Sequence, residues 1–158
     1  MYALKCNEEY AAAALALIRS ANETVLLSTF KIQQSTRPAD ANLQALILAL
    51  QAAALGGKKV KFLMNWEKSR RGVARTNESV ANSLASAGAD IRYLPDGRCC
   101  HSKILIADNH TMLLGSHNWS RASLTRNFEV SILVKDEIVI AATREVFYEH
   151  WALARAWL

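Results

Sequence analysis

A chain of 158 residues with 51% hydrophobic content is long enough to bury one core, but it lacks the run of roughly 20 apolar residues that a membrane-spanning helix needs. Its three cysteines are odd in number, which argues against a disulfide framework and favours reduced thiols. The net charge of +5 fits a polyanionic partner without identifying one. We therefore expect a single domain over residues 1–158 without stable membrane insertion. We expect it in the cytoplasm, because no signal peptide opens the chain, or in the periplasm if a leader has been removed.

The N-terminal half alternates between helical and extended patterns of apolar residues. Asn7 can cap the first helix, Pro38 fits the start of the second, and Gly56 and Gly57 can end it. These signals predict a helix over residues 7–20, a buried strand over 24–30, a loop over 33–37, a helix over 38–55 and a strand over 60–64.

The C-terminal half continues this alternation, with shorter strands separated by turn residues. The patterns predict a loop over residues 65–75, a helix from Thr76 or Asn77 to Gly88, strands over 91–94, 104–106, 112–114 and 128–134, a loop over 119–126, and a last helix that Asp136 caps. Strands that alternate with helices predict an α/β fold in which helices sandwich a mixed β-sheet.

The predicted loop over residues 65–75 is the most basic part of the chain. Lys68, Arg70 and Arg71 could follow a phosphate backbone while the ring of Trp66 stacks on a base. We therefore treat these four residues as candidates for substrate binding. The alternative is that the loop is only a solvated connection.

Two short apolar strands joined by a turn at Asn109 carry a group of chemically distinct side chains. His101 and Lys103 are two residues apart, so they point to the same side of a strand. Ser116 and Asn118 return beside them at the end of the partner strand. A nucleophile next to a positive charge and neutral donors is what attack on a phosphodiester requires.

The spacing H-x-K-x4-D-x6-G-S-x-N over residues 101–118 matches the HKD signature of the phospholipase D superfamily. Residues 127–130 resemble the N-x-E-V strand of that family, and residues 147–151 resemble its C-terminal helix. In size and element order the chain resembles the small Nuc-type bacterial endonucleases. The resemblance implies a phospholipase D/nuclease-like fold with one HKD motif per chain.

A single motif supplies one histidine, and no second H-x-K occurs in the chain. In-line displacement at phosphorus needs an attacking group and an acid on opposite sides. We therefore predict a two-fold homodimer that brings two copies of His101 face to face across the phosphate, as in the small single-motif relatives. His117 and Trp119 are candidates to line the interface, and Trp119 is also a candidate to contact substrate.

The superfamily resemblance assigns a role to each residue of the motif. His101 of one protomer would attack phosphorus and form a phosphohistidine, and His101 of the partner subunit would protonate the leaving oxygen and then activate water. Lys103 and Asn118 would bind the non-bridging oxygens. Ser116 and Glu129 would hydrogen-bond the far side of the imidazole. No metal or other cofactor is expected, because the lysines offset the charge and the sequence offers no carboxylate cluster for a cation.

Asp108 completes the motif, but its role is less direct. It lies on the strand face opposite His101 if alternation holds, because an odd number of residues separates the two. We expect it to bond backbone groups or a basic group near the site rather than the phosphate.

The resemblance identifies the reaction class better than the substrate. The small size and the basic loop favour a largely non-specific endonuclease on DNA or RNA. The alternative is a lipid phosphodiesterase of the phospholipase D type or a phosphatidyl transferase with a phospholipid substrate, for which the sequence offers no basic amphipathic helix. A third alternative is a nucleic-acid-binding module with a dead site, and the intact set of motif residues argues against it.

Overall fold

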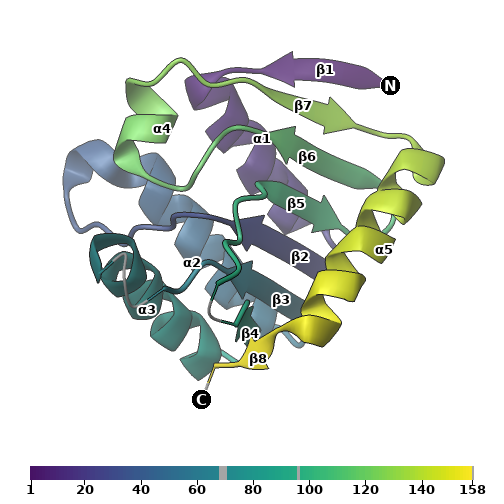
Figure 1. The fold of residues 1–158 in the computed structure, drawn as a ribbon. Coiled ribbons are helices and arrows are strands. Elements are labelled where there is room, and N and C mark those ends of the chain that lie inside the picture. The colour runs from purple at the N-terminus through teal and green to yellow at the C-terminus, as the bar shows by residue number, and fades with distance from the viewer. Residues whose placement is uncertain (68–70, 96, 158) are drawn as a thin grey trace.

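The computed structural model describes residues 1–67, 71–95 and 97–157, and within them eight strands form one mixed sheet (Figure 1). Its order is β1-β7-β6-β5-β2-β3-β4-β8. The strands are β1 (Tyr2–Lys5), β2 (Thr24–Thr29), β3 (Lys59–Met64), β4 (Asp90–Tyr93), β5 (Ile104–Ala107), β6 (Thr111–Gly115), β7 (Ser131–Val134) and β8 (Arg155–Ala156). Strand β3 pairs in parallel with β2 and β4, and the other neighbouring pairs are antiparallel. The predicted mixed sheet is therefore confirmed.

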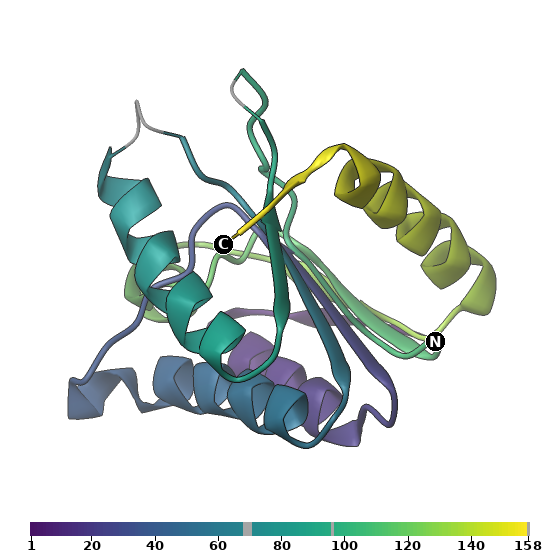
Figure 2. The same cartoon turned by 90° about the horizontal axis from the view of Figure 1, so that it is seen from below.

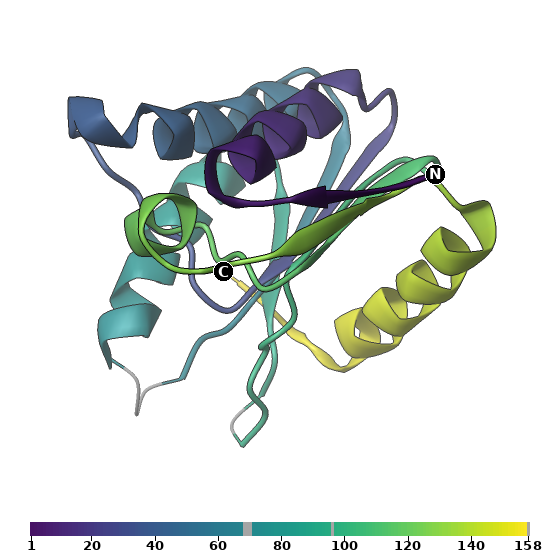
Figure 3. The ribbon, with the colours of Figure 1, turned by 90° about the horizontal axis from the view of Figure 1, so that it is seen from above.

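Helices cover both faces of this sheet, as predicted. The helices are α1 (Asn7–Ser20), η1 (Pro38–Asp40, a 3-10 helix), α2 (Ala41–Leu55), α3 (Arg71–Ser86), α4 (Arg121–Thr125) and α5 (Glu137–Leu153). Helices α1, α2 and α3 lie on one side of the sheet and α5 lies on the other (Figures 2 and 3). Among the described residues, no helix is long and apolar enough to cross a bilayer.

The central strand β2 contributes to two apolar cores. Val25 and Leu27 pack with α1 and α2, whereas Leu26 packs on the opposite face with the side chains of α5. A strand that is buried on both faces has a continuous apolar sequence, which is why the pattern of this segment predicted a buried strand.

Helix α3 begins at Arg71, before the predicted start at Thr76 or Asn77. Asn77 is fully buried within the helix rather than at its N-cap. Its carboxamide donates to the carbonyls of Phe30 and Asn65 and accepts from the amide of Ile32. An asparagine that favours caps in general is used here to satisfy backbone groups where β2 and β3 end.

Three shorter elements also differ from the predictions. Strands β1 and β8 lie at the two edges of the sheet and were not predicted. Helix α4 lies within the predicted loop over residues 119–126, and β7 begins at Ser131 rather than at residue 128. Edge strands of a few residues pair through backbone groups that every residue carries, so their sequences give little pattern to detect.

Candidate active site

Except for Asp108, the motif residues gather at one end of the strands, where β2 and β6 finish and β5 begins (Figure 1). The antiparallel register places Ile104 of β5 between Ser28 of β2 and Leu114 of β6. The site begins one residue beyond this row, with Thr29 at the end of β2, Lys103 before β5 and Gly115 at the end of β6. The amide of Gly115 donates to the carbonyl of Lys103 over 3.3 Å.

Gly115 allows β6 and β7 to approach closely at this point. A Cβ atom at position 115 would lie 2.3 Å from the Oγ of Ser131 and 2.5 Å from the carbonyl oxygen of Val130. These distances leave no room for any side chain. The glycine of the motif is therefore required by packing, and it holds the following Ser116 against β7.

His101 and Lys103 are in direct contact, since Nζ of the lysine lies 3.0 Å from Nδ1 of the imidazole. The ring of Phe30, which follows β2, lies 4.8 Å from the imidazole and 5.6 Å from the ammonium group. His101 is exposed, whereas Lys103 is buried. Burial lowers the pKa of Lys103 below its usual value, while nearby thiols and the carboxylate of Glu129 act in the opposite direction.

The lysine contact decides which imidazole nitrogen carries the proton. An ammonium group can only donate, so Nδ1 of His101 accepts and Nε2 of the neutral ring carries the proton. This neutral form donates a hydrogen bond from Nε2, but it is not an acid. To protonate a leaving oxygen the ring must carry protons on both nitrogens, and to attack phosphorus through Nε2 the ring must carry its proton on Nδ1. Lys103 must leave Nδ1 in either case, and Nδ1 must then donate to an acceptor.

Glu129 and Ser116 lie together at the start of β7. Oε1 of Glu129 accepts from Ser123 over 2.9 Å and from Asn127 over 3.1 Å, and Oγ of Ser116 accepts from the amide of Val130 over 3.1 Å. Burial raises the pKa of Glu129, but the hydrogen bonds from Ser116 and its other neighbours lower the pKa by more than burial raises it. The pKa therefore lies below its usual value. Within one chain, Lys103 occupies the imidazole Nδ1 that we expected Ser116 and Glu129 to contact.

The carboxamide of Asn118 is oriented by residues at the end of β2. Its Oδ1 accepts from the amide of Lys31 over 3.1 Å and from the hydroxyl of Thr29 over 3.4 Å. With Oδ1 engaged, Nδ2 is the atom left to act as a donor, which is the role expected at a phosphate oxygen. Sequence reasoning missed Thr29, Phe30 and Lys31. The available signal was their position immediately after a buried strand that pairs with the motif strand.

Asp108 lies at the opposite end of β5 from His101. Its carboxylate accepts from the backbone amides of Asn22, Glu23 and Thr24 at 2.8–2.9 Å, and its own φ is 50°. Desolvation raises the pKa of Asp108, but the three amide bonds outweigh it and the pKa lies below the usual value. The carboxylate of the motif therefore holds the turn between α1 and β2, away from the reacting groups.

Residues 14–151 match a family model described as "Cardiolipin synthase, PLD-like domain". The chain belongs to the phospholipase D superfamily. A cardiolipin synthase of Clostridium perfringens (strain 13 / Type A) is 29% identical over 106 residues, which cover 67% of this chain and 22% of the relative. The chain therefore spans about a fifth of the length of this relative.

Two solved structures share the fold of this superfamily member. Nuc, a phospholipase D family member from Salmonella typhimurium, superposes with a TM-score of 0.81 at 21% identity, over 99% of both chains. NucT from Helicobacter pylori superposes with a TM-score of 0.74 at 17% identity, again over 99% of both chains. The phospholipase D/nuclease-like fold is therefore confirmed.

Two aromatic residues of the superfamily motif region lie in the core rather than at a surface. Trp119 is fully buried and its Nε1 donates to the hydroxyl of Tyr10 over 2.9 Å. His117 is also fully buried, stacks on Tyr10 at 4.2 Å, and accepts from the amide of Asn7 through Nε2. Its Nδ1 therefore donates to Ser131, and burial lowers its pKa. The prediction that these two residues line an interface or contact substrate is wrong, because both fill the space between α1 and the motif loop.

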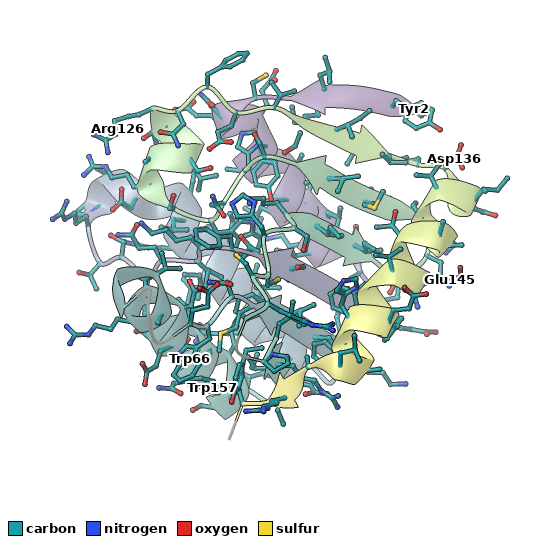
Figure 4. All side chains as sticks on the ribbon, viewed as in Figure 1. Tyr2, Trp66, Arg126, Asp136, Glu145 and Trp157 are labelled. Atoms are coloured by element: carbon teal, nitrogen blue, oxygen red, sulfur yellow. The ribbon has the colours of Figure 1, made fainter. Side chains whose placement is uncertain are left out.

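Part of the predicted basic loop can be placed. Lys68 and Arg70 lie outside the described residues, and Arg71 is described only as the first residue of α3. The ring of Trp66 packs at 5.2 Å from Tyr93 and 5.8 Å from Trp157 (Figure 4). Its Nε1 is buried without a hydrogen-bond partner. Trp66 is therefore part of an aromatic cluster at the β4 end of the sheet rather than an open stacking surface.

In residues 1–67, 71–95 and 97–157, no group of three or more histidine, cysteine, aspartate or glutamate side chains could hold a metal ion. No disulfide involves Cys6, Cys99 or Cys100, and of these three only Cys100 is buried.

Proposed function

We propose that this protein is a phosphodiesterase that acts on nucleic acid, through a phosphohistidine formed at a site shared by two protomers. The contact of 3.0 Å between Lys103 and His101 carries the proposal, because it joins a nucleophile and a positive charge at an exposed strand end. Asn118 supplies a fixed amide donor beside them. Membership of the phospholipase D superfamily supports the same chemistry.

The reaction would proceed in two displacements at phosphorus. Nε2 of His101 attacks, the bond from phosphorus to the leaving oxygen breaks, and His101 of the partner subunit, protonated on both nitrogens, gives that oxygen a proton and becomes neutral. The partner's His101 then takes a proton from water, whose oxygen displaces the first His101 and releases the phosphomonoester. During attack Lys103 moves from Nδ1 to the phosphate oxygens, and Glu129 is the carboxylate available to accept the Nδ1 proton.

An apolar row that is partly uncovered supports a second copy at this site. Leu4, Ile132, Leu114 and Ile104 lie opposite one another across four neighbouring strands. Leu4 is 67% exposed and Leu114 is 37% exposed, because α5 leaves this part of the sheet uncovered (Figure 1), whereas Ile104 is buried. The row ends at Ile104, directly after Lys103. A two-fold dimer that buries the row would bring the two copies of His101 toward each other.

Nucleic acid is favoured over lipid by charge and by the Nuc-like fold. The net charge is +5, and exposed Arg98 and Arg126 flank the motif, where they could hold a phosphate backbone. The second candidate is a lipid phosphodiesterase or phosphatidyl transferase with a phospholipid substrate. It is favoured by the matched family model, which is described as a cardiolipin synthase domain, and by the cardiolipin synthase of Clostridium perfringens.

A substrate panel in excess EDTA tests this proposal. Single-stranded DNA, duplex DNA, RNA and phosphatidylcholine vesicles are compared, and we expect cleavage of nucleic acid alone, since His101 and Lys103 provide both the nucleophile and the positive charge. His101→Ala should reduce cleavage by more than about 1,000-fold. His110→Ala, at an exposed histidine of the distant hairpin turn, is the matched control and should retain it.

Each other outcome has a defined meaning. Loss of cleavage in EDTA would contradict the metal-independent mechanism, and turnover of vesicles alone would favour the lipid candidate. Full activity of His101→Ala would exclude a phosphohistidine at this residue.

A further inference from the structure

A small pocket opens beside His101, between the strand ends and α5. Its volume is about 220 Å³. Its lining includes Leu94, Ile104, Val146, Phe147, His150 and His101 itself. The pocket lies on the α5 side of the sheet, since Ile104 and Phe147 belong to the core under that helix.

The walls of this pocket are mostly apolar, with polar atoms at a few positions. Phe147 contributes an aromatic ring that stacks on Trp151. Nδ1 of His150 donates to the carbonyl of Val146 over 2.9 Å, so Nε2 of the neutral ring is an acceptor. The hydroxyls of Ser28 and Ser102 also line the pocket and are hydrogen-bonded to each other. Apolar walls with a few polar groups suit a flat heterocycle that has polar edges.

We propose that this pocket receives one unstacked nucleobase of the nucleotide whose phosphate is attacked by His101. The inference rests on the proposed nuclease function and deepens it. Pockets for drug-sized ligands measure about 300–1,000 Å³, so a cavity of about 220 Å³ is suited to a single base rather than to the paired acyl chains of a phospholipid. His101 belongs to the pocket lining, so a base held there is adjacent to the scissile phosphate.

A base can enter the pocket only after it leaves its stack and its pair. Extrusion from a duplex costs free energy that a single strand does not require. The protein should therefore cleave single strands faster than duplexes, with little preference for base identity, because apolar contact and stacking are available to every base.

An abasic position tests the pocket directly. Single-stranded oligonucleotides that carry one tetrahydrofuran residue in place of a nucleotide are digested, and the cleavage rate at each bond is mapped. Since stacking of one base contributes substantially to binding, the wild-type protein should cleave the bond at the abasic residue about tenfold more slowly than the same bond in the intact strand.

A variant that fills the pocket should remove this difference. Val146 lines the pocket and is 50% exposed on α5, so Val146→Phe can occupy the cavity without disturbing the core. We expect this variant to cleave intact and abasic bonds at equal, reduced rates. Val139→Phe is the matched control, because Val139 is a 39% exposed valine of the same helix that does not line the pocket. It should behave as the wild-type protein does.

The outcomes separate this inference from the proposed function. Equal cleavage of intact and abasic bonds by the wild-type protein, or unchanged discrimination in Val146→Phe, would overturn the base pocket while leaving the nuclease function in place. If no nucleic acid is cleaved, both fail. Hydrolysis of dioctanoyl phosphatidylcholine that Val146→Phe abolishes would assign the pocket to an acyl chain and would likewise overturn both.

Discussion

At the scale of single residues, the protonation of His101 depends on which group is hydrogen-bonded to its Nδ1. Lys103 holds it within one protomer, which leaves the proton on Nε2 and makes the ring a donor. A nucleophilic ring needs the opposite tautomer, and a ring that gives a proton to the leaving oxygen must be protonated on both nitrogens. Both chemical roles that the mechanism assigns to His101 therefore require Lys103 to move from the imidazole to the phosphate.

Asp108 provides a residue-scale test of which motif groups are catalytic. Asp108→Asn keeps a side chain that tolerates the positive φ, but it loses the acceptor for the amide of Asn22. At neutral pH we expect the variant to be less stable by about 1 kcal/mol, with its activity per folded molecule unchanged. Thermal melts followed by circular dichroism, together with the cleavage rate, measure both quantities.

The pH dependence of this difference has a definite sign. Because the pKa of Asp108 is lower in the folded state than its usual value, its contribution to stability is present above the unfolded pKa of about 3.9 and is lost as pH falls through the folded pKa. The gap between wild type and Asp108→Asn should therefore close in acid. A variant with normal melting but no activity would show instead that Asp108 takes part in the reaction.

At the scale of elements, the pairing of β6 with β7 positions the polar loop that carries Ser116 and Asn118. The strand β5 and the hairpin were predicted correctly because their apolar runs are bounded by turn residues. The edge strands β1 and β8 and the start of α3 were not, because they depend on partners far along the chain. Phe30 and Lys31 reach the site through the same long-range pairing.

Gly115→Ala tests this element-scale requirement. The added methyl group would overlap β7 at Ser131, so we expect a loss of about 1–3 kcal/mol in the free energy of unfolding, and reduced activity as Ser116 and Asn118 shift. Gly72→Ala is the control, because nothing lies within 4 Å of its Cβ position in α3; it should be neutral or slightly stabilising. Denaturant unfolding distinguishes the two, and equal stability of both variants would refute the close approach.

At the scale of the whole molecule, the mechanism that we propose is complete only if two copies meet. The uncovered row that includes Leu4 and Leu114 gives an apolar surface next to the motif, on the sheet face that α5 covers only in part. Burial of such a row in a dimer removes apolar area from water. The proposed shared site and the exposed part of this row therefore predict the same assembly.

A charge placed in this row should separate the subunits. We expect Leu4→Glu to be a folded monomer with little activity, since a buried unpaired carboxylate opposes association. Leu55→Glu makes the same change at a 74% exposed leucine of α2 on the opposite side of the sheet and should remain dimeric and active. Sedimentation velocity with parallel activity assays gives the answer. A fully active Leu4→Glu monomer would contradict the shared site.

The sequence by itself determined the motif strand, the positions of His101 and Lys103 directly before it and the alternation of helices with strands, because these depend on neighbours within a few residues. Only the tertiary structure decided that Trp119 and His117 turn inward and that α5 closes a pocket beside His101. Burial and pocket shape are set by contacts between segments that are distant along the chain, and local periodicity carries no information about those contacts.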